Sequence, residues 1–157
     1  MSNKVKPHYS VRQVEFGDLP QLIEMLADDP LGALREDAQL PLNSKYSDAF
    51  QAISSDPNNE LMVLTSDGGT IGMLQLTFIP YLTHVGSWRC LVEGVRVHKD
   101  FRGQGLGAEL IQWSIDRAKE RHCKMIQLTS DKQRPEALRF YEMLGFKANH
   151  EGFKLKL

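Results

Sequence analysis

Residues 91–108 read Leu91-Val92-Glu93-Gly94-Val95-Arg96-Val97-His98-Lys99-Asp100-Phe101-Arg102-Gly103-Gln104-Gly105-Leu106-Gly107-Ala108, and this stretch decides the fold. Its first half is rich in valine and predicts a strand, and its second half is a glycine-rich turn. The turn is followed by apolar residues at helical spacing, namely Leu110, Ile111, Ile115 and Ala118. The turn is therefore expected to begin a helix. Packing of that apolar stripe is expected to hold the helix N-terminus at the glycines.

The glycine turn predicts a binding site for a diphosphate. Gly103, Gly105 and Gly107 carry no Cβ atom that would keep a phosphate away from the backbone. The free amides and the dipole of the helix N-terminus favour negative charge, and Arg102 adds a positive charge. A glycine turn at the start of a helix also occurs for structural reasons alone, so these residues by themselves leave both interpretations open.

The rest of the chain predicts one sheet with helices packed on it. The turn Asp67-Gly68-Gly69 between two apolar runs predicts a hairpin of antiparallel strands. No linker, low-complexity tract or internal repeat divides residues 1–157, so we expect a single domain of the α/β or α+β class. The expected strands cover residues 8–15, 60–65, 70–80, 88–97, 125–129 and 146–157. Four helices are expected: one that begins at residue 19, one over 48–55, one that follows the glycine turn and ends near 122, and one that begins at 135. Residues 31–45 are expected to form a loop or a short helix.

Two motifs resemble the hallmarks of one enzyme superfamily. The run Arg102-Gly103-Gln104-Gly105-Leu106-Gly107 matches the Gln/Arg-x-x-Gly-x-Gly/Ala signature of the GNAT superfamily of N-acetyltransferases. Residues 137–146 look like its second hallmark, Ala-x-x-Phe-Tyr-x-x-x-Gly-Phe, at the usual distance. The resemblance covers about 60–146 well and the N-terminal strand and helix loosely. It implies a GNAT fold, with a mixed and mostly antiparallel sheet flanked by helices, and transfer of acetyl from acetyl-coenzyme A to an amine.

The resemblance also implies where the coenzyme binds. Val95 and Val97 would hold the pantetheine arm through their backbone, as an added strand would. Gly94 inside the strand indicates a bulge or a close backbone approach, with a simple packing glycine as the alternative. Amides of the glycine turn would hold the pyrophosphate. The complete set of expected coenzyme-binding residues is Val95, Arg96, Val97, Arg102, Gly103, Gln104, Gly105, Leu106, Gly107, Ala108 and Arg134.

Glu93 is the candidate catalytic base. An alkylammonium with a pKa near ~10.4 must lose a proton before the amine can attack, and a carboxylate can take that proton directly or through water. Strand alternation places Glu93 on the same face as Val95 and Val97 unless a bulge at Gly94 shifts the phase. A solvated glutamate paired with Arg96 is the alternative interpretation.

Tyr141 is the candidate catalytic acid, because the resemblance gives its counterpart the protonation of the departing thiolate. A phenol with a pKa near ~10 suits that task. Without the motif, Tyr141 would be assigned to an apolar helix stripe with Phe140 and Leu144. Arg134 departs from the pattern, since many relatives have asparagine three residues before the alanine; it either reaches a coenzyme phosphate or is a surface arginine.

Composition narrows the partners. The 19 Lys and Arg residues against 20 acidic ones give a net charge of −1, which offers no general attraction for nucleic acid or an anionic membrane. No run approaches the ~18 apolar residues of a membrane span and no apolar leader opens the chain, so we expect a cytoplasmic protein. The five histidines and the cysteines Cys90 and Cys123 lack metal-ligand spacing, so no metal site is expected. The expected partner is a small-molecule amine, and the resemblance is compatible with a homodimer.

Two other function classes compete with this interpretation. Residues 103–108 also satisfy the loose G-x-G-x-x-G/A fingerprint of dinucleotide-binding proteins, with Asp131 near the expected spacing. A nicotinamide-dependent oxidoreductase is disfavoured because an antiparallel hairpin precedes the motif and only ~50 residues follow it. A catalytically silent GNAT-like module that binds acyl-coenzyme A as a sensor is the second alternative, and Glu93 with Tyr141 argues against it.

Overall fold

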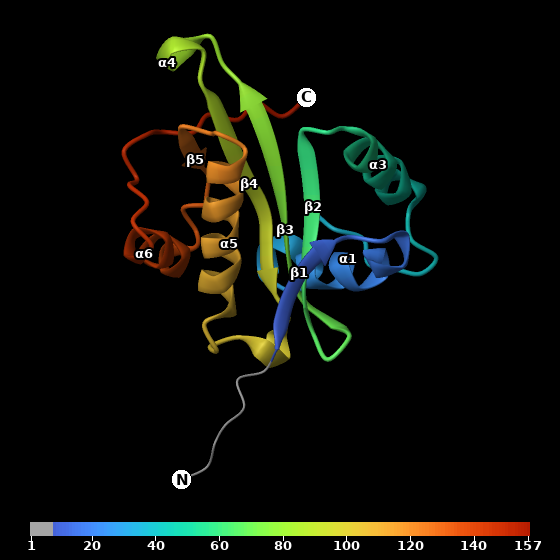
Figure 1. The fold of residues 1–157 in the computed structure, drawn as a ribbon. Helices are drawn as coiled ribbons and strands as arrows, with labels where there is room; N and C mark the ends of the chain where they lie inside the picture. Colours follow the sequence, from blue (N-terminus) through green and yellow to red (C-terminus); the bar gives the residue numbers. More distant parts are fainter. Residues whose placement is uncertain (1–7) are drawn as a thin grey trace.

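The structure is a computed structural model that describes residues 8–157; the first seven residues, part of the stretch expected to carry no apolar leader, lie outside the described residues. Figure 1 shows a central sheet with helices on both of its faces. The strands are β1 (Tyr9–Gln13), β2 (Asn59–Ser66), β3 (Gly69–Pro80), β4 (Trp88–Val97) and β5 (Met125–Gln127). The α-helices are α1 (Leu19–Ala27), α2 (Pro30–Ala33), α3 (Ser44–Ser55), α4 (Thr83–Gly86), α5 (Leu106–Glu120) and α6 (Pro135–Met143), with 3₁₀ turns at Phe16–Asp18 and Lys99–Phe101.

The sheet is mixed and mostly antiparallel, which confirms the expected fold class. In the described part of the chain, its strands lie in the order β1-β2-β3-β4-β5, and only the β4–β5 pair is parallel. The hairpin expected between β2 and β3 is present, with Ser66 opposite Gly69. Asp67 and Gly68 have φ of 49° and 82°, and two positive φ angles in a two-residue turn match the twist of the flanking strands.

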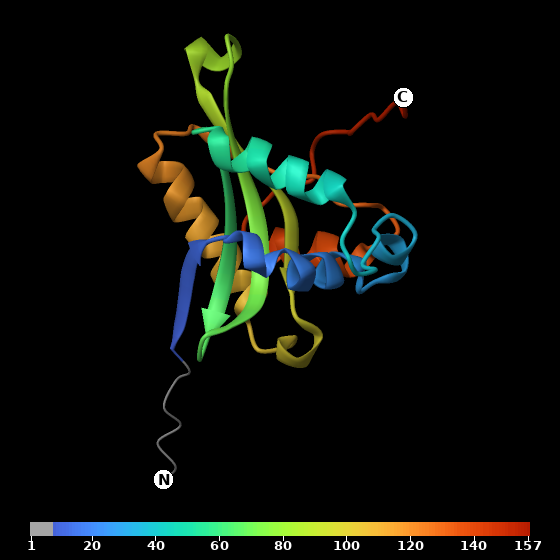
Figure 2. The ribbon, with the colours of Figure 1, turned by 90° about the vertical axis from the view of Figure 1, so that its right-hand side faces the viewer.

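Each face of the sheet has its own apolar core, because successive side chains on β2 and β3 point to opposite faces. On one face, α1 buries Leu22 and Met25 against Val63 and Met73, and Phe50 of α3 packs at the margin. On the other face, α5 and α6 cover the sheet (Figures 1 and 2). Residues buried in that second core include Leu64, Leu74, Leu76, Val92, Leu106, Leu110 and Ile111.

The strand expected over 146–157 is wrong. These residues form neither a helix nor a strand, and Phe153 and Leu155 are 94% and 86% exposed. Alternating apolar residues make a strand only where a neighbouring strand takes up the backbone hydrogen bonds, and the sheet ends at β5. β5 itself stops at Gln127, two residues earlier than expected, because its ladder to β4 covers only three residue pairs.

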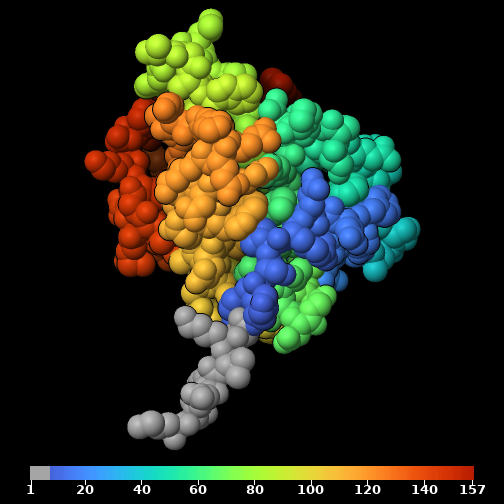
Figure 3. All heavy atoms as spheres, in the orientation of Figure 1, coloured from blue at the N-terminus to red at the C-terminus, as the bar shows by residue number. Residues whose placement is uncertain are grey.

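Two further differences concern short helices. α3 begins at Ser44 and not at 48, since the Asn43 side chain accepts a hydrogen bond from the Lys45 amide and caps the helix earlier. α4 lies at the tip of the β3–β4 hairpin, where no helix was expected, and Figure 3 shows it projecting beyond the body of the molecule. Within residues 8–157, no helix combines the length and apolarity needed to span a bilayer.

Candidate active site

The N-terminus of α5 forms as the glycine motif predicts. Gly103 and Gly105 have φ of 74° and 82°, a left-handed conformation that favours glycine, and a Cβ atom on either would meet nothing within 4 Å. Gly105 is the N-cap of α5, and no side chain from residues 8–157 caps this end. The amides of the first turn therefore face open space with the positive end of the helix dipole behind them.

Gly107 serves a different purpose from the other two glycines. A Cβ atom at Gly107 would come within 3.3 Å of the Phe140 ring, so its absence lets α6 pack closely on α5. Phe140 and Tyr141 lie edge to face at 5.0 Å between ring centroids. The two sequence hallmarks are thus in direct contact: the glycine motif on α5 makes room for the aromatic pair on α6.

β4 carries a bulge at Gly94 that reverses the side-chain phase. Gly94 has a φ of 61°, and the ladder to β3 shifts between Met73 and Gln75. Glu93 lies opposite Gln75 and Arg96 lies opposite Met73, so both point to the face covered by α1. Because of this bulge, Glu93 does not share a face with Val95 and Val97.

Val95 and Val97 lie on the opposite face, against the core beneath α5. The amide of His98 bonds to Ile71 of β3, so by strand alternation the backbone groups of Val95 and Val97 point away from β3, toward the outer edge of β4. The β4–β5 ladder ends at Leu91, and past that point no strand in residues 8–157 pairs with this edge. The structure therefore leaves an open strand edge that leads to the N-terminus of α5.

Arginine side chains donate hydrogen bonds to the backbone carbonyls of this edge. Arg96 Nη1 donates to the Val95 carbonyl at 2.8 Å, and Arg102 Nε donates to the Val97 carbonyl at 3.1 Å. Arg102 also donates through Nη2 to the Asp28 carboxylate at 2.7 Å. The edge carbonyls are thus satisfied within the chain, whereas the amides of Val95 and Val97 face the opening.

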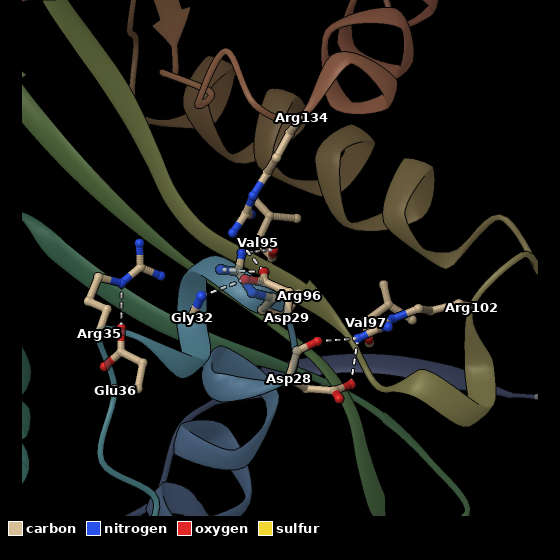
Figure 4. A network of polar contacts seen from close by, with 10 residues as sticks. All are labelled: Asp28, Asp29, Gly32, Arg35, Glu36, Val95, Arg96, Val97, Arg102 and Arg134. Carbon is tan, nitrogen blue, oxygen red and sulfur yellow. Dashed lines mark hydrogen bonds and ion pairs between the residues drawn. The ribbon is translucent and has the colours of Figure 1, made fainter.

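Arg134 is held at the same opening by Asp29. Its Nη2 donates to Asp29 Oδ2 at 2.7 Å, a contact that joins the start of α6 to the turn between α1 and α2 (Figure 4). Arg96 Nη2 lies 3.6 Å from the same carboxylate oxygen. Burial raises the pKa of Asp29, but the hydrogen bond from the Gly32 amide and the charges of Arg134 and Arg96 outweigh it, so the pKa is lowered and the carboxylate stays charged.

These side chains surround a cavity of about 260 Å³ at the β4 edge. A larger hollow, of about 440 Å³, lies between β1, β2 and α5, and neither Glu93 nor Tyr141 is among the lining residues of either cavity. We take the smaller cavity as the candidate active site because it adjoins the open edge and the uncapped helix. Its lining residues are Asp28, Asp29, Val95, Arg96, Val97, Arg102 and Arg134.

Tyr141 is largely enclosed beside this cavity. Its ring packs against Phe140 and, at 5.8 Å, against Phe146. Burial raises the pKa of the Tyr141 phenol, and the nearby charges of Arg96 and Arg134 partly oppose that shift. The phenol is therefore protonated at neutral pH and is in a state to donate a proton.

Sequence reasoning missed Asp28 and Asp29 as candidate site residues. Their partners Arg102 and Arg134 lie 74 and 105 residues away in the chain. The available signal was a pair of carboxylates before Pro30 without a basic residue close by in sequence. Of the expected coenzyme set, the structure brings Val95, Arg96, Val97, Arg102 and Arg134 around one cavity, and the residues of the glycine turn follow directly at the start of α5.

Comparison with known proteins decides the family. Residues 21–146 match the family model described as the acetyltransferase (GNAT) family. The chain belongs to the GNAT acetyltransferase family. Membership agrees with the sequence resemblance and with the expected co-substrate, acetyl-coenzyme A. The dinucleotide alternative fails, since its fold needs a mostly parallel sheet and this GNAT sheet has one parallel pair.

Individual relatives agree with the family. Over 108 residues the chain is 29% identical to an aminoalkylphosphonate N-acetyltransferase of Salmonella typhimurium, covering 69% of this chain and 70% of the relative. Over 90 residues it is 32% identical to a glucosamine 6-phosphate N-acetyltransferase of Trypanosoma brucei brucei, covering 57% and 59%. A crystal structure described as a transcriptional regulator from Bacillus halodurans C-125 is 56% identical, with a TM-score of 0.92, over 96% of this chain and all of that one.

Proposed function

We propose that this GNAT protein transfers the acetyl group of acetyl-coenzyme A to the primary amine of a small molecule, by direct attack within a ternary complex. One observation carries the proposal: the open outer edge of β4 leads to the uncapped N-terminus of α5. A pantetheine arm needs a strand edge with free amides, and a pyrophosphate needs free helix amides. Both lie at the 260 Å³ cavity or next to it.

In this proposal the coenzyme follows the chain. The outward amides of Val95 and Val97 bond the pantetheine, and the amides from Gly103 to Ala108 bond the pyrophosphate. Arg102 adds positive charge beside the pyrophosphate. Gly103 and Gly105 leave room for the phosphate oxygens, because apart from the adjacent residues no atom of residues 8–157 lies within 4 Å of either missing Cβ.

The proposed chemistry uses Glu93 and Tyr141. The Glu93 carboxylate, directly or through water, takes a proton from the ammonium, and the amine lone pair attacks the thioester carbon. A backbone amide near Val95 stabilises the oxyanion as the tetrahedral intermediate forms. The C–S bond then breaks and the thiolate takes the phenol proton of Tyr141. The attacking nitrogen loses its remaining extra proton, which restores the Tyr141 phenol, so the products are the N-acetylated amine and coenzyme A, with the first proton left on Glu93 for release to solvent.

The two curated relatives support a small-molecule acceptor. One acts on aminoalkylphosphonates and the other on glucosamine 6-phosphate, and both acceptors combine an amine with a phospho-anion. The Bacillus halodurans protein is described as a transcriptional regulator. The net charge of −1 on the present chain gives no general attraction for DNA, so we do not propose a nucleic-acid partner.

The experiment that tests this function pairs Tyr141→Phe with Tyr9→Phe. Each removes one phenol oxygen, but Tyr9 lies on β1, the far edge strand of the sheet from β5. Calorimetric titration should show that both variants bind acetyl-coenzyme A like the parent. Amine-dependent thiol release should fall about 100-fold or more in Tyr141→Phe, as loss of general acid catalysis implies, and be unchanged in Tyr9→Phe. Full turnover by Tyr141→Phe would remove Tyr141 from the mechanism.

A further inference from the structure

One positive charge at the cavity has no carboxylate of its own. Arg35 pairs with Glu36 at 2.8 Å, and Arg102 pairs with Asp28 at 2.7 Å. Arg96 and Arg134 share the single carboxylate of Asp29, at 3.6 and 2.7 Å (Figure 4). Arg35 and Glu36 lie outside the cavity lining, so three guanidinium groups there face two carboxylates, and the excess charge lies with Arg96, which has the longest of these contacts.

Arg96 is also poorly satisfied as a hydrogen-bond donor. Its side chain is only 15% exposed, and its Nε is buried with no hydrogen-bond partner among the residues that the structure describes. Nη1 donates to the Val95 carbonyl, whereas the distance from Nη2 to Asp29 is too long for a good hydrogen bond. A buried guanidinium with unmade hydrogen bonds is costly, so a residue in this state indicates an absent anionic partner.

The bulge at Gly94 sets the direction in which Arg96 points. Arg96 and Glu93 lie on the α1 face of β4, whereas Val95 and Val97 lie on the α5 face. The residues opposite Arg96 and Glu93, Met73 and Gln75, are two positions apart on β3. Two residues of strand span about 7 Å. One face of β4 therefore presents the Glu93 carboxylate and the Arg96 guanidinium from backbone positions about 7 Å apart, next to the proposed site of acetyl transfer.

We propose that the acceptor is a short amine bearing a phosphonate or phosphate group, and that Arg96, assisted by Arg134, binds this anion while Glu93 faces the amine. The inference rests on the proposed function, because it takes Glu93 as the base. A phospho-anion has three oxygens and up to two charges, so it can accept bonds from both guanidiniums while Asp29 still compensates one of them. Arg96 thereby acts as a specificity-determining residue.

The coenzyme is the other source of phosphate at this cavity, and the sequence resemblance placed Arg96 among the coenzyme-binding residues, whereas we assign its side chain to the acceptor instead. Its pyrophosphate is assigned to the helix N-terminus and Arg102, next to Val97 and beyond Arg96 along the chain. If Arg96 instead binds a coenzyme phosphate, its removal weakens coenzyme affinity and leaves acceptor preference unchanged. The two sources are therefore separable by measuring both quantities in the same variants.

The experiment compares three acceptors: 2-aminoethylphosphonate, its carboxylate analogue β-alanine, and uncharged propylamine. They are tested on the parent, Arg96→Gln, Arg96→Lys and the control Arg139→Gln, an exposed arginine of α6. Arg96→Gln is expected to raise KM for 2-aminoethylphosphonate about 30-fold, since it leaves the anion unpaired, and to leave KM for propylamine and the acetyl-coenzyme A Kd within twofold. Arg96→Lys keeps the charge but not the fork and should fall between; Arg139→Gln should match the parent.

Three outcomes would overturn the inference: a parent enzyme that prefers propylamine, an Arg96→Gln variant that keeps the phosphonate preference, or a variant whose main loss is in coenzyme affinity. If the parent binds coenzyme A but acetylates no amine, the proposed function fails and the anion site is tested by itself. Calorimetric titration of the coenzyme A complex with 2-aminoethylphosphonate should then show binding in the parent and none in Arg96→Gln. Absence of binding to the parent would reject the site as well.

Discussion

Asp28→Asn is expected to tighten acetyl-coenzyme A binding, although it breaks an ion pair. Asp28 holds Arg102 at 2.7 Å, next to the proposed pyrophosphate site. Its carboxylate therefore both occupies the cation that would bind the pyrophosphate and repels the incoming negative charge. Replacing it by the neutral amide of similar shape removes both effects.

The magnitude follows from Coulomb's law. Two unit charges ~7 Å apart interact by roughly 0.6 to 1.2 kcal/mol for an effective dielectric constant of ~40 to 80. Both side chains of the pair are partly exposed, 49% for Arg102 and 41% for Asp28, so we use about 1 kcal/mol in total. This corresponds to about fivefold tighter binding. The free energy of unfolding should change by less than about 1 kcal/mol, because exposed ion pairs contribute little.

The assay is calorimetric titration with acetyl-coenzyme A at low and at high salt. The matched control is Asp48→Asn, which removes the same charge from an exposed position on α3. The gain in Asp28→Asn should shrink toward parity at ~1 M salt, where the Debye length is ~3 Å, and Asp48→Asn should equal the parent throughout. Weaker binding by Asp28→Asn at low salt would refute this reasoning and would mean that Asp28 organises the site for the coenzyme.

Three further predictions concern stability and reactivity. Gly32→Ala should lower the free energy of unfolding by about 2 to 4 kcal/mol in urea titrations, because its Cβ would clash with the backbone carbonyl of Leu26. The control Gly17→Ala, whose Cβ would meet nothing within 4 Å, should lower it by under ~1 kcal/mol. Equal stabilities of the two variants would contradict the packing at α2. Burial raises the pKa of the Cys90 thiol to about 12, so at pH 8 an alkylating reagent should label Cys90 only after denaturation, and rapid labelling of the native protein would show that β4 opens. The hydrogen bonds from Arg12, helped by the Glu15 amide, lower the pKa of Asp18 despite its burial. The stability that Asp18 contributes is therefore present above its unfolded pKa of ~3.9 and is lost as pH falls through the lower folded pKa. The melting temperature of the parent should fall more between pH 7 and pH 2 than that of Asp18→Asn, and parallel pH profiles would exclude this carboxylate as a source of acid lability.

Local patterns predicted the parts of the fold that local physics determines. Residues Asp67 and Gly68 specify a two-residue hairpin turn through their positive φ, and both bounds of β4 were predicted correctly. Gly103 and Gly105 predicted the uncapped N-terminus of α5 for a similar reason. These signals span a few residues each, and no distant contact is needed to understand them.

Non-local features were beyond the sequence. The alternation of Phe153, Leu155 and Leu157 resembles a strand, but only the sheet can decide whether a partner strand is available. The glycine at 94 indicated a bulge, whereas the phase that it gives Glu93 and Arg96 required the register to β3. The ion pairs of Asp28 and Asp29 join residues 74 and 105 positions apart, so no local pattern could pair them.

The most direct test of the central claim is to follow the acetyl group itself. The protein is incubated with acetyl-coenzyme A that carries an isotopically labelled acetyl group and with a panel of small primary amines. The products are identified and quantified by mass spectrometry. Direct transfer predicts equimolar coenzyme A and labelled N-acetylamine, no acetylated protein, and loss of both products in Tyr141→Phe at undiminished acetyl-coenzyme A binding. Tight binding of acetyl-coenzyme A with no labelled amine from any member of the panel would contradict the claim and favour a sensor of acyl-coenzyme A.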